Sequence, residues 1–181
     1  MKRLLMTVCI SMVVISGWLM SAANAGEVSK KTQWVGVNPL GLVFNMYGGH
    51  YGRYVKDGAA DITVPFFFWN PTEDCSMIGV GAKYHIYKDG DGKGVFYGGG
   101  DQVMRVNWDY TKTEQITATT FTPQGEVGYR WIWGKNKELT IAPSMAAGVT
   151  MGEVKSNSGV AAEYGSAGFS WQLGIGLAYM F

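Results

Sequence analysis

The final segment of the chain, GFSWQLGIGLAYMF, alternates strictly between large apolar side chains and small or polar ones. Its large apolar members are Phe169, Trp171, Leu173, Ile175, Leu177, Tyr179 and Phe181. A period of two predicts a β-strand with one fully apolar face. In water, such a strand at the end of a chain would expose an apolar stripe and an unpaired backbone edge, which favours aggregation. The fold must therefore cover both the apolar face and the edge.

The beginning of the chain has the organisation of a cleaved export signal. Lys2 and Arg3 precede a mostly apolar run over residues 4–20, and Ala23-Asn24-Ala25 follows as a small-x-small cleavage pattern. We therefore expect cleavage between Ala25 and Gly26. A retained transmembrane anchor is the alternative, but Thr, Ser and Gly residues interrupt the apolar run. The expected organisation is a signal peptide over residues 1–25 and one folded domain over residues 26–181.

Charge and cysteine content exclude several classes of protein. The whole chain has a formal net charge of +1, and loss of the two cations Lys2 and Arg3 changes it to −1. No basic field remains that would recruit nucleic acid. Cys75 is the single cysteine after residue 25, so the expected mature chain has no intramolecular disulfide. The 26 Gly, 10 Tyr, 7 Trp and 8 Phe indicate strands and turns.

Further segments alternate with the same period and predict about eight strands in all. These segments are residues 34–46, 50–55, 61–69, 77–87, 95–110, 120–133, 138–151 and 168–181. The second, fourth and sixth connections, KDGAA, KDGDGKG and GKNK, are rich in turn residues of the kind that close hairpins. An even number of strands places both ends of the domain on one side, together with these short turns. We therefore predict an all-β, closed antiparallel transmembrane β-barrel.

The face opposite the apolar one decides between a membrane barrel and a soluble one. It is rich in Gly, Ala, Ser and Thr, whereas a soluble barrel presents many charges to water. Small residues suit the narrow lumen of a barrel with about eight strands. The apolar faces then point outward to lipid, with aromatic residues near the strand ends. The expected aromatic girdle residues are Trp34, Trp69, Trp108, Tyr110, Trp131, Trp133, Trp171 and Tyr179.

The few charged residues of the predicted inner face form the candidate site. In the segment 95–110 we expect Phe96, Met104, Val106 and Trp108 to face outward, which places Asp101 and Arg105 inside. Opposite charges alternate between adjacent strands, so we expect a network of ion pairs that fills the lumen. The alternative is a path for ions or solutes. The predicted network consists of Lys83, His85, Asp101, Arg105, Glu126 and Arg130, with Arg53 beside them.

The export signal, the alternating strands and the C-terminal WQLGIGLAYMF resemble the small outer-membrane β-barrels of the OmpA, OmpX and OmpW kind. The resemblance covers the whole predicted mature chain. It implies a monomer in the outer membrane of a Gram-negative bacterium, in contact with outer-membrane lipid and lipopolysaccharide. It also implies that the barrel-assembly machinery reads Phe181, Tyr179 and Leu177. The implied function is a structural, adhesive or small-solute role.

Two other functions remain open. Some outer-membrane enzymes that modify lipid A share this architecture and use a Ser and a His on one strand face. Neither His50 nor His85 has a Ser two positions away, so we expect no catalytic residue, with His85 the nominee if there is one. The second alternative is a soluble secreted lipocalin-like barrel that binds an apolar ligand. No His/Cys/Asp/Glu cluster has the spacing of metal ligands, and we expect no metal or cofactor.

Overall fold

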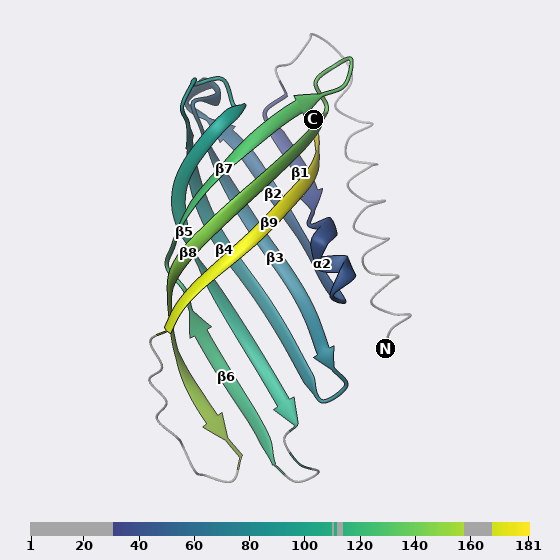
Figure 1. The fold of residues 1–181 in the computed structure, drawn as a ribbon, viewed down its shortest axis with the longest axis vertical. Coiled ribbons are helices and arrows are strands. Elements are labelled where there is room, and N and C mark those ends of the chain that lie inside the picture. The colour runs from purple at the N-terminus through teal and green to yellow at the C-terminus, as the bar shows by residue number, and fades with distance from the viewer. Residues whose placement is uncertain (1–30, 110, 112–113, 158–167) are drawn as a thin grey trace. The chain divides into compact units, whose positions relative to one another are not determined.

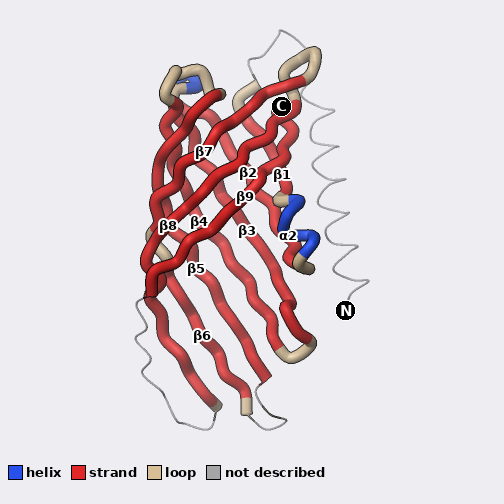
Figure 2. Tube along the Cα trace, in the orientation of Figure 1, coloured by secondary structure: helices blue, strands red, loops and turns tan. Residues whose placement is uncertain are grey.

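The computed structural model describes residues 31–109, 111, 114–157 and 168–181, of which Thr32–Met180 form one compact unit. This unit consists almost entirely of β-strands (Figures 1 and 2). The strands are β1 (Gln33–Val37), β2 (Met46–Val55), β3 (Ala60–Thr72), β4 (Cys75–Tyr87), β5 (Gly94–Asp109), β6 (Gln115–Phe121), β7 (Gln124–Trp133), β8 (Leu139–Ser156) and β9 (Gly168–Met180). Two short helices accompany them, α2 (Pro39–Val43) and the 3-10 turn η1 (Lys56–Gly58). Among the described residues, no helix has the length and apolar character needed to cross a membrane.

The strands form a closed antiparallel β-barrel of eight strands, which confirms the all-β, closed antiparallel barrel predicted from the sequence. Antiparallel pairing of β1 with β9 over Leu177–Met180 joins the first strand to the last and closes the wall at that level. β6 and β7 together make one strand of the wall. Both pair with β5 and with β8 in one continuous register, and they are separated only by Thr122 and Pro123. Proline has no N–H to contribute to the ladder, which explains why the strand is interrupted there.

Short turns lie at one end of the barrel. The connections β2–β3, β4–β5 and β7–β8 lie at the end where β1 begins and β9 finishes, which we call the proximal end (Figure 1). The connections β3–β4, β5–β6 and β8–β9 lie at the opposite, distal end. This arrangement follows the alternation of turns expected from the sequence.

The first strand is shorter than predicted. The segment 34–46 was expected to be one strand, but β1 ends at Val37 and α2 follows. Asn38 caps the helix by accepting a hydrogen bond from the Leu40 N–H at 3.1 Å, and Pro39 occupies the first helical turn, where a missing N–H costs nothing. The apolar alternation in this segment therefore does not reflect a strand.

The direction of the side chains agrees with the prediction in most strands. Large apolar residues point outward in β3, β4, β7, β8 and β9, where they are exposed, as the examples Phe66, Ile78, Val127, Met145 and Leu173 show. The aromatic residues Trp131, Trp133, Trp171 and Tyr179 are also exposed.

By contrast, Trp34 is only 1% exposed and faces inward over Gly52. Trp69 lies opposite Met77 on the inward side, and its indole N–H donates to the Phe44 carbonyl oxygen. Trp108 lies on the same inward face of β5 as Met104 and Val106. Tyr110 lies outside the described residues.

In β5 the predicted facing was wrong. Phe96 is 2% exposed and lies inside, whereas Val95 and Tyr97 are exposed on the outside. Side chains two residues apart share a face, so Met104 and Val106 also point inward. Asp101 and Arg105 consequently lie on the outward face, in the same series as exposed Val103. Arg53 of β2 is likewise exposed and pairs with outward Ile62, so it does not face the lumen either.

Glycines on the inner face create the space that large inward side chains fill. A Cβ added at Gly52 would lie 2.2 Å from the Trp34 ring, and one at Gly79 would lie 2.2 Å from the Phe67 ring. These glycines are the direct cross-strand partners of the large residues. The inner packing therefore depends on a large residue on one strand lying over a glycine on the next. Equivalent pairs are Phe96 over Gly128 and His50 over Gly36.

Candidate functional site

The proximal half of the lumen contains a buried network of charged and aromatic side chains. Because strand residues two apart share a face, Lys83, His85 and Tyr87 of β4 all point inward. Glu126 and Arg130 of β7 do the same from across the barrel. Asp61 of β3 and Tyr54 of β2 complete the network, which we call the lumen network.

Two carboxylates organise the charges of this network. The Glu126 Oε2 atom lies 2.5 Å from Lys83 Nζ and 3.5 Å from His85 Nε2. The Asp61 Oδ1 atom lies 2.9 Å from His85 Nδ1, and Asp61 Oδ2 lies 3.3 Å from Arg130 Nη1. His85 therefore lies between the two carboxylates and links β3, β4 and β7. Buried charges are tolerated only when they are paired in this way.

Asp61 is the centre of the network. It is fully buried, with 0% exposure. Besides its two ionic partners, its carboxylate accepts hydrogen bonds from the Thr63 hydroxyl and the Tyr87 hydroxyl. A carboxylate has about four acceptor positions, and here each is directed at a donor. The position of Asp61 is thereby fixed by β3 itself, by β4 and by β7.

Aromatic rings surround the Arg130 guanidinium. Its Cζ atom lies 4.4 Å from the centre of the Trp34 ring and 5.3 Å from that of Tyr87. The rings of Tyr54 and Phe96 lie at 5.7 and 5.9 Å. Cation–π attraction is strongest where water is excluded, and Arg130 is only 6% exposed. The guanidinium and these rings together close the proximal end of the lumen with packed side chains.

The structure brings together four of the six residues predicted to form the network. Lys83, His85, Glu126 and Arg130 are in mutual contact or share a partner. Asp101 and Arg105 do not belong to the lumen network, because they lie on the outward face. Arg105 instead donates from Nε to Asn107 Oδ1 at 3.3 Å, on the same outward face.

Sequence reasoning missed Asp61, Tyr54 and Tyr87. Asp61 and Thr63 alternate with Ile62 and Val64, so the opposite face of this strand did carry a signal. Tyr87 lies two residues beyond His85 in the same inward series. The segment 50–55, which contains Tyr54, is too short for its alternation to indicate which side chains face inward.

A layer of amide and hydroxyl side chains lies on the distal side of the charges. The Gln172 side-chain N–H donates to Gln102 Oε1 at 3.1 Å, and the hydroxyls of Thr122 and Thr150 lie 2.9 Å apart. Gln124 is 8% exposed, and its Nε2 atom has no hydrogen-bond partner among the described residues. We call these five residues the amide layer.

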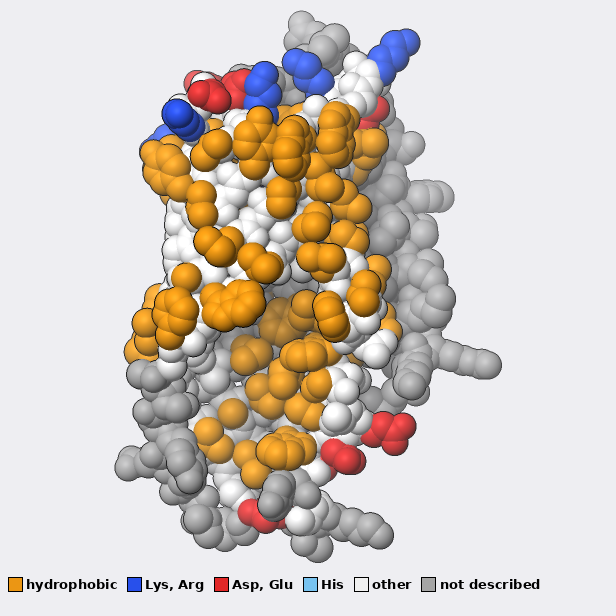
Figure 3. All heavy atoms as spheres, in the orientation of Figure 1, with side chains coloured by type: hydrophobic (Ala, Val, Ile, Leu, Met, Phe, Trp, Pro, Cys, Tyr) orange, Lys and Arg blue, Asp and Glu red, His pale blue; other side chains and the backbone are white. Residues whose placement is uncertain are grey.

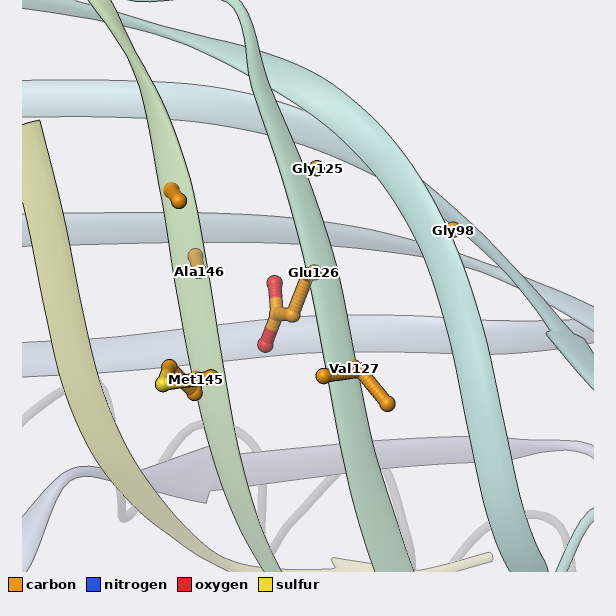
Figure 4. Close-up of a pocket in the computed structure, with 7 residues that line it drawn as sticks. Gly98, Gly125, Glu126, Val127, Met145 and Ala146 are labelled. Atoms are coloured by element: carbon orange, nitrogen blue, oxygen red, sulfur yellow. The ribbon is translucent and has the colours of Figure 1, made fainter. Parts of the chain in front are cut away.

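A separate pocket lies in the wall between β5, β7 and β8. It has a volume of about 370 Å³ and is lined by Gly98, Gly125, Glu126, Val127, Met145, Ala146 and Ala147. Figure 4 shows Glu126 beside Ala146, with Met145 and Val127 next to them. Apart from Glu126 the lining is apolar or glycine, and Glu126 is already paired with Lys83. The pocket therefore adds no chemical group to those of the lumen network.

The geometry around the histidines is that of ion pairs. The two ring nitrogens of His85 lie within ion-pair distance of carboxylates, Nδ1 at 2.9 Å from Asp61 and Nε2 at 3.5 Å from Glu126. The ring of His50 lies against Gly36 and Gly176. Within the described part of the chain, no group of three or more His, Cys, Asp or Glu residues could hold a metal ion. Cys75 is a free, half-buried thiol at the start of β4.

The predicted assembly residues are placed as expected for their strand. Leu177 and Tyr179 are exposed on the outward face of β9, and Phe181 follows directly after this strand. The predicted cleavage position, Ala25 and Gly26, lies outside the described residues. No protein-family model, curated protein or solved structure matches this chain.

Proposed function

We propose that this protein is an integral outer-membrane β-barrel whose lumen is closed by packed side chains, with a structural or small-solute role. The observation that carries this proposal is the reversed distribution of polarity. Large apolar side chains cover the outside of the described wall, while the buried residues include Asp61, His85 and Arg130. Figure 3 shows hydrophobic side chains over the face of the barrel, with Lys and Arg near its upper end and Asp and Glu near both ends. Such a surface is stable in lipid and not in water.

Closure of the barrel supports the same proposal. In a bilayer every backbone polar group needs an internal partner, and the antiparallel pairing of neighbouring strands supplies partners around the wall except along the β1-side edge of β9 at residues 168–176. A soluble lipocalin-like barrel would place charges on its outer face and apolar side chains throughout its interior. Here the proximal interior contains the lumen network instead, which favours the membrane protein over the soluble one.

The packed proximal half favours a plug over a pore. Trp34, Phe96 and Arg130 are each at most 6% exposed. A barrel of about eight strands has an interior just wide enough to be filled by side chains. The lumen network thus acts as a plug that joins strands on different sides of the wall.

Three measurements test this proposal. The protein should fractionate with detergent-insoluble outer membranes, and its gel migration should shift on heating. In planar bilayers the purified protein should give no steady conductance. Recovery in the soluble periplasmic fraction would contradict the membrane assignment. Steady conductance whose ion selectivity changes in Arg130→Ala would replace the plug by a channel.

The alternative of lipid A modification is tested separately. Mass analysis of lipid A from cells with and without the gene should show the same acyl pattern. A pattern that changes with the gene and reverts with His85→Ala would assign an enzyme instead. The variant His50→Ala provides the matched control, because His50 belongs to the same lumen but contacts neither Asp61 nor Glu126 within ion-pair distance.

A further inference from the structure

The barrel wall has a gap beside β9 in its distal half. β9 pairs with β8 from Gly168 to Tyr179, but it pairs with β1 only from Leu177 to Met180. Because β1 ends at Val37, the other edge of β9 over residues 168–176 has no strand partner among the described residues. α2 follows β1 and contacts both β9 and β2, so it borders the gap (Figure 1).

The most exposed large apolar side chains in the described part of the chain border this gap. On β9 these are Phe169, Trp171 and Leu173, which are 77, 65 and 64% exposed. At α2 they are Val43 and Phe44, at 75 and 66%. The other exposed large apolar residues are 57% exposed or less. The gap therefore has an apolar lip on each side, continuous with the outer apolar surface.

The gap leads to an apolar part of the lumen. Distal to the amide layer, most inward side chains are apolar and only half-buried, in contrast to the tightly packed proximal half, and Thr120 and Ser156 are polar exceptions. They include Phe67 of β3, Met77 of β4, Met104 and Val106 of β5, Ile116 of β6 and Val154 of β8. Figure 3 shows this region as a hollow with hydrophobic side chains inside it. We call it the distal chamber.

The floor of the distal chamber is polar. Gln124 is buried, shares the inward face of β7 with Glu126, and has an Nε2 donor without a partner in the described structure. A buried amide N–H left unpaired is costly unless a ligand supplies an acceptor. The nearby Gln102 and Gln172 side chains use one another as partners. The chamber therefore combines an apolar wall with a free hydrogen-bond donor at its base.

We propose that the distal chamber binds one long-chain fatty acid, which enters sideways from the lipid through the gap beside β9. Its carboxyl group accepts a hydrogen bond from Gln124, and its chain lies along the inward side chains of β3 to β6. From Gln102 to Trp108 the β5 backbone spans about 20 Å, at about 3.3 Å per residue, which suits a long alkyl chain. A phospholipid fits less well, because its acyl chains would point their terminal methyl groups at the polar floor. This inference extends the small-solute role and rests on the proposed membrane location.

The test uses the full protein in nanodiscs of phosphatidylcholine and palmitate that carries a mid-chain diazirine. After illumination, mass spectrometry should locate adducts on peptides with inward residues such as Met104 and Phe67. Labelling should saturate, and excess unlabelled palmitate should reduce it at least tenfold. Saturable labelling restricted to outward side chains, or inward labelling that palmitate does not reduce, would overturn the proposal.

Two valines of β5 provide a matched pair of variants. Val106→Asn places an amide in the distal chamber, whereas Val103→Asn places it on the outward face. We expect Val106→Asn to lower inward labelling at least fivefold and Val103→Asn to leave it unchanged. Both variants should keep the heat-dependent gel shift, which shows that they fold. Equal effects of the two substitutions would contradict a site inside the barrel.

Further variants and probes in the labelling experiment identify the ligand. Gln124→Leu should weaken palmitate binding about fivefold, the value of one hydrogen bond, and leave labelling by a diazirine alkane without a head group unchanged. Inward labelling only by a diazirine phospholipid would overturn the fatty-acid assignment, and cross-links between copies at β9 would assign the gap to a second protein molecule. Failure to insert into nanodiscs would defeat the proposed function itself. Insertion without inward labelling would defeat this inference alone.

Discussion

The Asp61 carboxylate lies 3.3 Å from the Arg130 guanidinium, although the two residues belong to β3 and β7, with β4 and β5 between them along the wall. Both side chains are buried, at 0 and 6% exposure. The ion pair therefore crosses the interior of the barrel and connects strands that share no backbone hydrogen bonds.

Replacing Arg130 should destabilise the protein strongly. Arg130→Met removes the charge that faces Asp61 and leaves a buried carboxylate whose remaining ion-pair partner among the described residues is His85. Loss of one partner from a buried pair costs about 3–5 kcal/mol. The free energy of unfolding in detergent, followed by the gel shift or by tryptophan fluorescence, should fall by this amount.

Two further variants check the cause of this loss. Arg105→Met removes a cation from the outward face and should change stability by less than about 1 kcal/mol. The double variant Asp61→Asn with Arg130→Met should cost less than the sum of the single changes, because neither charge is then left alone. Additive costs would show that the two residues do not interact.

The Lys83–Glu126 pair should show the same coupling. Lys83 Nζ and Glu126 Oε2 lie 2.5 Å apart, and the Glu126 side chain is 7% exposed. Glu126→Gln alone leaves Lys83 without its carboxylate, whereas Lys83→Met with Glu126→Gln removes both charges. We expect the double variant to be more stable than the Glu126→Gln single variant, as measured by urea unfolding in detergent. The reverse order would indicate that Lys83 stabilises the barrel independently of Glu126.

The glycines opposite large side chains should resist even the smallest substitution. In Gly52→Ala the new Cβ would lie 2.2 Å from the Trp34 ring, so the ring must move within a packed interior. Overpacking of this kind costs about 1–3 kcal/mol. Gly125→Ala is the matched control, since its nearest neighbour would be the Gly98 carbonyl oxygen at 3.9 Å. The control should be neutral or slightly stabilising in the same unfolding experiment.

The period of two was sufficient to predict the barrel, the number of strands and the outward face of most of them. It failed for residues 38–45, where Asn38 and Pro39 carry the signal for a helix start that overrides the apolar alternation. A short helix and a short strand both contain a few apolar residues, so periodicity alone does not separate them.

The facing of β5 was mispredicted for a different reason. Phe96, Met104 and Val106 are apolar, and apolar side chains were assigned to the outside without regard to neighbouring strands. Their inward direction follows from cross-strand partners, such as Gly128 opposite Phe96 and Gly79 opposite Met104. Gln102 has the same period of two as Phe96, Met104 and Val106. As a polar residue among apolar ones, it was the signal in the sequence that this face points inward. The contacts of Asp61 likewise depend on the register of β3 against β4, which no single segment of sequence contains.

The end of the chain provides a prediction about assembly. Phe181 follows β9, whose outward face presents Tyr179 and Leu177. If the barrel-assembly machinery reads this terminal pattern, Phe181→Lys or deletion of Phe181 should lower the amount of inserted protein. The decrease should be far larger than the accompanying loss of stability explains. Burial of one Phe side chain contributes only about 1.5–3 kcal/mol. Phe181→Tyr keeps an aromatic ring and serves as the control, with insertion close to wild type. Heat-shifted barrel in outer-membrane fractions measures insertion, and unfolding of the refolded variants measures stability. Undiminished insertion of Phe181→Lys would mean that the last residue contributes to packing alone.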